Sequence, residues 1–272
     1  MSGKAGPGTN PASGTPAGGT AVQRVWEACS TALSWMTILP FAGAREYNRQ
    51  VGGRAMAALP LAGVVIGAIS ALAALAFHRT PLVAAAVALV VSELLTRFMH
   101  VDAVADVADA LGSYAKPEKA REILRDSHSG AFAVAAVALI YIVIFASFAS
   151  ALSVPGPAEW TVFFSLWAGR VAGLVPATTT FDPLSESGFG GLIIGTVHWW
   201  WIGVWWAVLS AASLPVCGPW IAVSSAFSLA SVYVLSRHMS SRFDGLNGDC
   251  VGACVLLGTV ITAAMSCALV AL

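Results

Sequence analysis

Residues 131–152 read AFAVAAVALIYIVIFASFASAL, a run of 22 residues that contains no charged side chain. An α-helix needs about 20 apolar residues to cross the hydrocarbon core of a bilayer. The rest of the chain has a similar character, because 57% of its 272 residues are hydrophobic and only 10% are charged. Soluble domains carry about 25% charged residues. The sequence therefore predicts an integral membrane protein built from α-helices.

Seven segments are apolar and long enough, or nearly so, to span a membrane. They are 55–77, 81–99, 131–152, 160–180, 192–214, 219–236 and 251–272. The segments 81–99 and 160–180 fit least well, because the first contains Glu93 and Arg97 and the second contains Arg170 near its middle. The predicted fold is all-α, a polytopic integral membrane helical bundle of about seven spans, with six as the alternative.

The N-terminal part has a different composition. Residues 1–20 are almost entirely Gly, Pro, Ser, Thr and Ala, which cannot bury a core, so they are predicted to be a disordered tail. Between Val22 and Met36 the larger apolar side chains share one helical face, which predicts an interfacial amphipathic helix on the membrane surface. Residues 21–272 are predicted to form a single transmembrane domain.

Residues 100–130 concentrate charge, with ten charged side chains in one predicted loop. Asp102, Asp106 and Asp109 are spaced i, i+4 and i+7, which places the three carboxylates on one face of a helix. Because like charges at this spacing repel, a cation would stabilise the stripe, and oxygen ligands suit Mg²⁺ or Mn²⁺. A solvated helix face beside the bilayer is the alternative. Asp102, directly after a span, is expected at the membrane boundary and Asp109 in more water.

Basic residues predict the orientation. With seven spans, nine Lys and Arg residues of the loops and helix ends fall on the N-terminal side and only Arg79 falls opposite. The positive-inside rule makes the N-terminal side cytoplasmic. The same map places loops 100–130, 181–191 and 237–250 there, with ten of the 14 acidic residues. One cytoplasmic site assembled from three loops is therefore predicted.

The second and third of these loops are rich in glycine. In 237–250, Gly248 lets the backbone approach a ligand, and Asn247 with Asp249 offers oxygens to a metal or to hydroxyls. The glycines at 188, 190 and 191 either expose amides to a phosphate or only make turns.

Charged residues within the spans need partners. Arg170 is expected either to form a structural salt bridge or to reach a diphosphate from the cytoplasmic side. Glu93 and Arg97, spaced i,i+4, are expected to satisfy each other. The five histidines show no metal-ligand spacing, and each is interpreted as structural.

Taken in order, these motifs resemble the adenosylcobinamide-GDP ribazoletransferase family, the membrane cobalamin synthases of bacteria. The resemblance runs from about Leu33 to the C-terminus. It is carried by Arg54, Pro60 and Gly63, by His100, Asp102, Ala105, Asp106 and Asp109, by REILRDSHSG at 121–130, by Arg170, and by NGDCVGA at 247–253. The chain departs from the family pattern at Ala103, Ala110, His128, Leu256 and Thr259.

The resemblance implies a transferase that joins the two halves of cobalamin. The 3′-hydroxyl of α-ribazole, or of its 5′-phosphate, would attack the cobinamide-proximal phosphorus of adenosylcobinamide-GDP, release GMP and give adenosylcobalamin or its 5′-phosphate. The implied catalytic residues are Asp102 and Asp106. The implied cofactor is Mg²⁺, with Mn²⁺ as the alternative, held by Asp102, Asp106, Asp109 and Asp249. The implied substrate-binding residues are Arg125, Asp126, Ser127, Arg170, Asn247 and Gly248.

The implied location is the bacterial inner membrane, with the active site facing the cytoplasm. The expected partners are these substrates and the lipid bilayer, without nucleic acid, and the sequence does not determine the oligomeric state. Two alternative functions stay open. A cation-coupled transporter also carries acids and an Arg within a polytopic bundle, although transport sites usually lie near the midplane. A CDP-alcohol phosphotransferase-like enzyme shares the acidic metal-binding logic, but its characteristic aspartate spacing is missing here.

Overall fold

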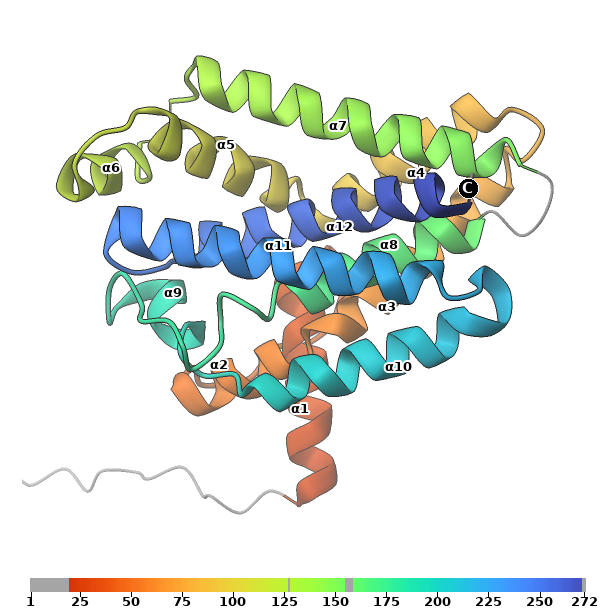
Figure 1. Ribbon diagram of the computed structural model, residues 1–272. Helices are drawn as coiled ribbons and strands as arrows, with labels where there is room; N and C mark the ends of the chain where they lie inside the picture. The colour runs from red at the N-terminus through yellow and green to blue at the C-terminus, as the bar shows by residue number, and fades with distance from the viewer. Residues whose placement is uncertain (1–19, 127, 155–158, 271–272) are drawn as a thin grey trace, which may run out of the picture.

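The computed structural model describes residues 20–126, 128–154 and 159–270, which fold into one bundle of α-helices (Figure 1). Extended pairing among these residues is limited to two isolated bridges, Thr178 with Val197 and Pro183 with Leu246. The helices are α1 (Ala21–Met36), α2 (Arg49–Ala57), α3 (Leu59–Leu75), α4 (Pro81–Thr96), α5 (Met99–Gly112), α6 (Pro117–Ile123), α7 (Ala131–Leu152), α8 (Glu159–Ala172), α9 (Gly188–Ile193), α10 (Trp199–Cys217), α11 (Trp220–Phe243) and α12 (Gly248–Val270). The predicted all-α class is confirmed.

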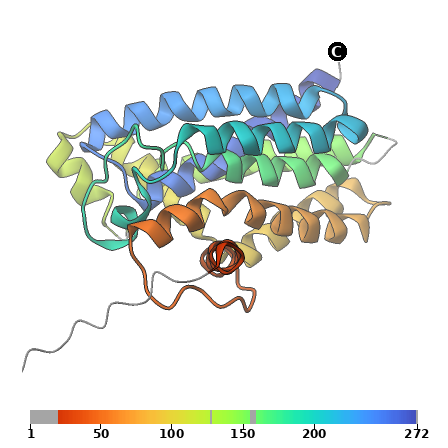
Figure 2. The same ribbon diagram turned by 90° about the horizontal axis from the view of Figure 1, so that it is seen from below.

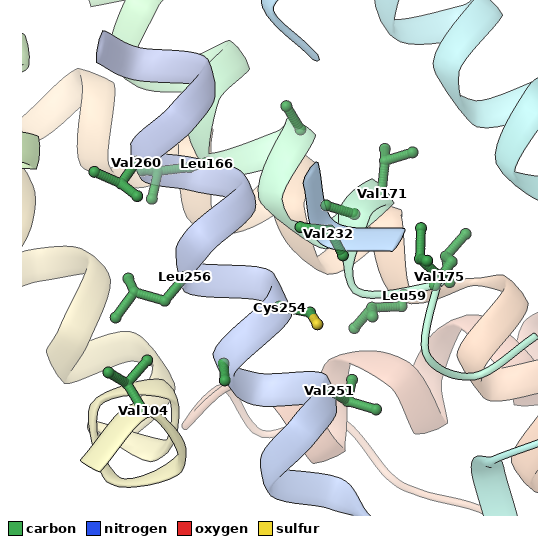
Figure 3. Close-up of a cluster of buried hydrophobic side chains, with 14 of the residues drawn as sticks. Leu59, Val104, Leu166, Val171, Val175, Val232, Val251, Cys254, Leu256 and Val260 are labelled. Carbon is green, nitrogen blue, oxygen red and sulfur yellow. The ribbon is translucent and has the colours of Figure 1, made fainter. Parts of the chain in front are cut away.

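Helix α12 lies at the centre of the bundle. It packs against α5, α7, α8 and α11, and α8 in turn packs against α3. Figure 3 shows apolar side chains around α12, among them Val251, Leu256 and Val260, which are 4%, 5% and 6% exposed. Lipid tails are as apolar as these side chains. The association of helices within a membrane is therefore driven by close packing and not by the exclusion of water. The fit of side chains around α12 therefore stabilises the bundle.

Helices α8 and α12 approach closely at Gly169. A Cβ atom there would lie 2.6 Å from the carbonyl oxygen of Val255 and would also collide with the Thr259 hydroxyl. Small residues at such crossings let two helix backbones come together. Thr259 is 1% exposed, and its hydroxyl donates to the Val255 carbonyl at 3.0 Å. This departure from the family pattern therefore has a packing role between α8 and α12.

Helix length and composition agree better with the alternative of six spans than with seven. By length and composition, four helices can cross a membrane: α7, α10, α11 and α12. Two bent pairs raise the number to six if each counts as one span, namely α2 with α3, bent by 42°, and α4 with α5, bent by 87°. Helix α8 has 14 residues, about 21 Å at the rise of an α-helix, and residues 173–180 of the predicted span are not helical. Length and composition alone therefore give four to six spans among the described residues, while α8 packs along both α3 and α12 and returns the chain through the bundle between α7 and α10.

Helices extend further into the predicted loops than expected. Loop 100–130 contains most of α5 and all of α6, whereas loop 237–250 is reduced to residues 244–247, because α11 continues to Phe243. From Asp102 onward, α5 carries three carboxylates in eight residues, and charge within hydrocarbon is costly. We therefore assign the apolar part of the α4–α5 pair to α4 and treat α5 from Asp102 onward as lying outside the spanning segments.

Helix α1 runs across the direction of the bundle helices, upright in Figure 1 and end-on in Figure 2. In its first half the predicted apolar face is exposed, with Val22 at 77% and Trp26 at 67%. Its second half packs against α2 and α3, and there Ser30 and Thr31 are buried, although the sequence pattern places both on the polar face. Thr20 caps the helix by accepting a hydrogen bond from the Gln23 amide, so it is not part of a tail. Residues 1–19 of the predicted tail lie outside the described residues.

Candidate functional site

A cavity of about 460 Å³ lies where α5, α9 and α12 meet the end of α1. Its polar lining includes two carboxylates, Asp102 from α5 and Asp249 from the first turn of α12. The guanidinium-bearing Arg97 also lines it, and so do the rings of Trp35 and Phe189, which meet edge to face at a centroid distance of 5.0 Å. The cavity therefore combines negative, positive and aromatic groups.

The three predicted loops do come together beside this cavity. The second and third pair through their backbones, because the Leu184 amide donates to Leu246 at 2.7 Å and the Leu246 amide donates to Asp182 at 3.0 Å. Gly245 makes the crossing possible: its φ is +133°, and a Cβ atom there would lie 2.8 Å from the Cα of Leu184. Of the first loop, the Arg121 guanidinium donates to Asp244 at 3.3 Å. The three loops therefore contact one another, and their assembly into one cytoplasmic site stays a prediction.

The sharp bend between α4 and α5 brings two residues of the cavity lining, Arg97 and Asp102, into place. Arg97 and Phe98 both have left-handed backbone conformations, with φ of 56° and 57°. Such conformations cost about 1–3 kcal/mol each in non-glycine residues and persist where the surrounding structure enforces them. The bend ends the helix before Arg97, so the expected Glu93–Arg97 pair does not form. Instead, the Arg97 guanidinium donates to the Trp35 carbonyl at 3.0 Å.

Asn247 organises the first turn of α12. Its side-chain oxygen accepts from the Cys250 amide at 3.1 Å, and its side-chain nitrogen donates to the Asp249 carboxylate at 2.6 Å. A carboxylate in the first turn also interacts favourably with the helix dipole. Asn247 therefore positions Asp249 at the cavity, while Gly248 lines the cavity beside it.

His100, one of the residues that carry the family resemblance, also lines the cavity. Its side chain is 3% exposed, and its Nδ1 atom has no hydrogen-bond partner among the described residues. A buried polar atom without a partner is costly, and the packing of the described residues does not compensate this one. The sequence favours a structural role for this histidine because it has no metal-ligand spacing. Its place at the bend, two residues before Asp102, is what brings it to the site.

Asp106 lies one helical turn beyond Asp102, next to the cavity rather than among its lining residues. Partial burial raises the pKa of Asp106 to about 6, and the negative charges of Asp102, Asp249 and Asp109 add to the rise. The predicted acidic residues therefore form a real cluster, in which α5 and α12 both contribute negative charge. Repulsion within this cluster favours a bound cation.

The charge of Asp106 should make the metal-free protein less stable at high pH. The folded-state pKa of about 6 lies above the usual value for an aspartate, so the stability that the neutral form provides is lost as the pH rises through about 6. In excess EDTA, Asp106→Asn is expected to melt at a higher temperature than the wild type at pH 8, and the difference should shrink toward pH 4. Equal melting temperatures at pH 8 would show that neither burial nor the neighbouring carboxylates penalise the charge of Asp106.

Asp109 makes backbone contacts that the sequence does not predict, and its role as a metal ligand stays a prediction. Its two carboxylate oxygens accept hydrogen bonds from backbone amides at the start of α7, from Gly130 at 2.5 Å and from Ala133 at 2.9 Å. It is also half-buried, whereas Asp102 is exposed to the cavity, so the expected order of exposure is reversed. A carboxylate that accepts amides at a helix N-terminus stabilises that helix. Asp109 thus anchors α7 to α5.

The residues present can be compared with what a divalent cation needs. Among the described residues, no group of three or more His, Cys, Asp or Glu side chains converges closely enough to hold a metal by itself. Mg²⁺, however, is usually held by one or two carboxylates together with waters and substrate phosphates. Asp102 and Asp249 line one cavity and fit this pattern, with Asp106 close by. The fit is to a cation that binds together with a phosphate-containing substrate.

Arg170 lies inside the bundle and does not line this cavity. Its side chain is 4% exposed, one of its guanidinium nitrogens donates to the Leu166 carbonyl at 3.1 Å, and its Nε atom has no partner among the described residues. The buried carboxylate of Glu93 attracts it, and Tyr141 lies beside both. Glu93 is therefore an acidic neighbour of Arg170 within the bundle, although the described residues show no ion pair between the two, and the predicted contact of Arg170 with phosphate stays a prediction.

The predicted substrate-binding residues at the end of loop 100–130 are not at the cavity. Arg125 and Asp126 are exposed, and the Asp126 carboxylate accepts from the His128 amide at 3.0 Å and contacts the His128 ring at 2.7 Å. Ser127 lies outside the described residues. Asn247 and Gly248 are thus the predicted substrate-binding residues that the structure brings to the cavity carboxylates.

Comparison with known proteins matches the chain to one family. The family model described as Cobalamin-5-phosphate synthase matches residues 28–267. A protein of Corynebacterium efficiens named adenosylcobinamide-GDP ribazoletransferase is 42% identical over 249 residues, which cover 87% of this chain and 90% of the relative. Proteins with the same name from Corynebacterium diphtheriae and Frankia casuarinae are 37% and 27% identical, over 86% and 85% of this chain and 88% and 91% of their own lengths. No solved structure matches the chain.

Proposed function

The chain belongs to the cobalamin-5-phosphate synthase family, and on that premise we propose that it joins adenosylcobinamide-GDP to α-ribazole or its 5′-phosphate and releases GMP. The observation that supports this activity is the cavity, in which Asp102 and Asp249 from separate helices line one space with Arg97 and His100. A transfer between a diphosphate and a hydroxyl needs these kinds of group in one place.

The proposed reaction is a displacement at phosphorus. A hydroxyl oxygen of α-ribazole forms a bond to the cobinamide-proximal phosphorus, the bond from that phosphorus to the bridging oxygen breaks, and GMP leaves with the electron pair. The hydroxyl proton passes to a carboxylate of the cluster, for which Asp102 and Asp106 are the proposed residues. Arg97 lies on the cavity wall, where its charge stabilises non-bridging phosphate oxygens.

Mg²⁺ is the proposed cofactor, with Mn²⁺ as a substitute, and Asp102 and Asp249 would hold it with Asp106 nearby. A divalent ion bound there would neutralise the negative charge that develops on the diphosphate. The protein itself provides the rest: Asn247 orients Asp249, and the bend at Arg97 and Phe98 orients Asp102. The aromatic rings of Trp35 and Phe189 offer apolar surface on which the base of a nucleoside can pack.

The activity can be tested directly. Purified protein in detergent or vesicles, incubated with adenosylcobinamide-GDP, α-ribazole and Mg²⁺, is expected to release one GMP for each corrinoid product. EDTA should abolish GMP release, and Mg²⁺ or Mn²⁺ should restore it. Release that continues after exhaustive chelation would exclude the metal, and the absence of product in any metal would exclude the proposed function. A preparation that shows a single melting transition serves as the control for folding.

We also propose that the protein resides in a bacterial cytoplasmic membrane with the cavity facing the cytoplasm. The basic residues Lys116, Lys119 and Arg121 lie on α6 and just before it, at the cavity end of the bundle, whereas Arg79 lies in the turn between α3 and α4 at the opposite end (Figure 1). The positive-inside rule then favours a cytoplasmic cavity.

This orientation predicts the result of cysteine labelling. In a background without the five native cysteines, single cysteines at Ser113, Ser187 or Ser241 should not react with a membrane-impermeant reagent in intact cells. All three positions are exposed on the surface of the protein, so disruption of the membrane should allow labelling. A cysteine at Arg79 should react in intact cells. The reverse pattern would place the cavity on the outer side.

A further inference from the structure

A second cavity, of about 870 Å³, lies between α1, the α2–α3 pair and α10. It is lined by the first half of α1, whereas the candidate site is lined by residues at the end of α1. None of the residues assigned above to metal, substrate or catalysis lines it. Its volume lies within the range of about 300–1,000 Å³ that is typical of sites for small organic molecules. We call this cavity the α1–α10 groove.

The walls of the α1–α10 groove are apolar. Ala28 of α1, Leu61 of α3 and the rings of Trp201 and Trp205 on α10 contribute to them. The indole nitrogen of Trp205 donates to the Ala57 carbonyl at 2.7 Å, so its polar atom is already satisfied and the ring offers carbon surface. In a protein that spans a membrane, apolar surface of this kind matches the chemistry of an acyl chain rather than that of water.

Three arginine side chains also line the α1–α10 groove. Arg24, Arg49 and Arg54 line the groove, and no Asp or Glu lines it. The Arg54 guanidinium lies 3.6 Å from the Glu27 carboxylate, and Arg49 donates to the backbone carbonyls of Gly191 and Ile194. The guanidinium of Arg24 makes no hydrogen bond or ion pair within the part of the chain that the structure describes. The groove thus has a positive charge that is free to bind an anion.

The orientation of α1 indicates the depth of Arg24 in the bilayer. Helix α1 lies across the direction of the spans, and its exposed apolar residues include Val22 and Trp26. A helix with this geometry and an apolar face lies at the boundary of headgroups and acyl chains. Arg24, which is on the same half of α1, is therefore at the depth of lipid phosphates. Basic pockets between helices at this depth bind anionic lipid headgroups.

From the apolar walls, the unpaired Arg24 and the position of α1, we propose that the α1–α10 groove binds one anionic phospholipid. An acyl chain lies along Ala28, Leu61 and Trp205, and the phosphate contacts Arg24. The bound lipid fills a space that would otherwise separate α1 from α10 and so stabilises the packing of α1 on the bundle. This binding is independent of the proposed transferase reaction, because the two cavities share no lining residue.

The experiment uses the full-length protein, purified in a neutral detergent and stripped of lipid. Its melting temperature is measured during titration with phosphatidylglycerol, with phosphatidylcholine of the same acyl chains, and with inorganic phosphate. Phosphatidylglycerol is expected to raise the melting temperature in a saturable manner, because a ligand that binds the folded state stabilises it. Phosphatidylcholine should give a clearly smaller rise at equal concentration, and inorganic phosphate should give none.

Two variants and a control connect the effect to the groove. Arg24→Gln should move the midpoint of the phosphatidylglycerol titration to about fivefold higher concentration, the scale of one lost cation contact at a lipid surface. Arg45→Gln, which changes an exposed arginine that does not line the groove, should leave the midpoint unchanged. Ala28→Trp fills the groove while retaining every arginine. This change should weaken the binding of both phosphatidylglycerol and phosphatidylcholine.

Several results would overturn the proposal. Equal stabilisation by the two lipids would show an apolar site without selection for an anion, and stabilisation by inorganic phosphate would show a site for a soluble anion. A midpoint that Arg24→Gln and Ala28→Trp leave unchanged would place lipid binding elsewhere. If adenosylcobinamide-GDP stabilises the wild type but not Arg24→Gln, and phosphatidylglycerol has no effect, the groove belongs to the substrate. Because all readouts are melting temperatures, an inactive transferase does not affect them.

Discussion

Replacement of Asp102 by asparagine is expected to lower turnover by at least about 10²-fold, the scale of losing one important electrostatic contact in an active site. The change keeps the size of the side chain and removes only its charge. Asp102 is exposed to the cavity and lies in the same lining as Asp249, so its carboxylate is able to contact both a cation and the diphosphate. GMP release at saturating substrate and Mg²⁺ measures the effect.

The matched control for this result is Glu118→Gln. Glu118 is an exposed residue of α6 that does not line the cavity, and the same type of change there should alter turnover little. Both variants must insert into membranes at wild-type levels and melt within a few degrees of the wild type. Near-normal turnover in Asp102→Asn, together with an inactive Glu118→Gln, would place the site on α6 instead of at the α5–α12 cavity.

The sequence predicts those parts of the fold that are determined by neighbouring residues in the chain. The span 131–152 is predicted with the bounds that α7 has, because a mainly apolar run between Gly130 and Ser153 marks both of its ends. The bend after Thr96 is not predicted, because neither Arg97 nor Phe98 is a residue type that marks a left-handed conformation. The expected pairing of Glu93 with Arg97 is wrong for the same reason: it requires the helix to continue.

In the candidate site, too, the sequence predicts some residues and not others. The convergence of Asp102 with Asp249 follows from counting spans and placing the acidic loops on one side. Trp35, Arg97 and Phe189 could not be found in this way, because they come from three distant segments and only the folded chain brings them together. Asp109 shares the spacing of the acidic stripe, yet the position of the α7 amides, which is a tertiary feature, determines its backbone contacts.

Arg170 gives the second large effect, and it decides between the two roles that its sequence position suggests. The side chain is buried in the bundle, where Glu93 is its charged neighbour. Removal of one of two buried opposite charges is destabilising, because the other charge is left without compensation. Arg170→Met is therefore expected to lower the melting temperature strongly and to reduce the yield of folded protein, as measured by thermal denaturation in detergent.

A double variant tests whether this loss comes from an uncompensated charge. Glu93→Gln combined with Arg170→Met leaves no charge at either position, so the double variant should recover most of the stability that Arg170→Met loses, which is non-additivity expected only of interacting residues. If the single and double variants melt at the same low temperature, the two charges do not interact. If Arg170→Met melts normally but requires much more adenosylcobinamide-GDP for half-maximal GMP release, then Arg170 acts on the diphosphate, and its burial in the bundle is relieved when substrate binds.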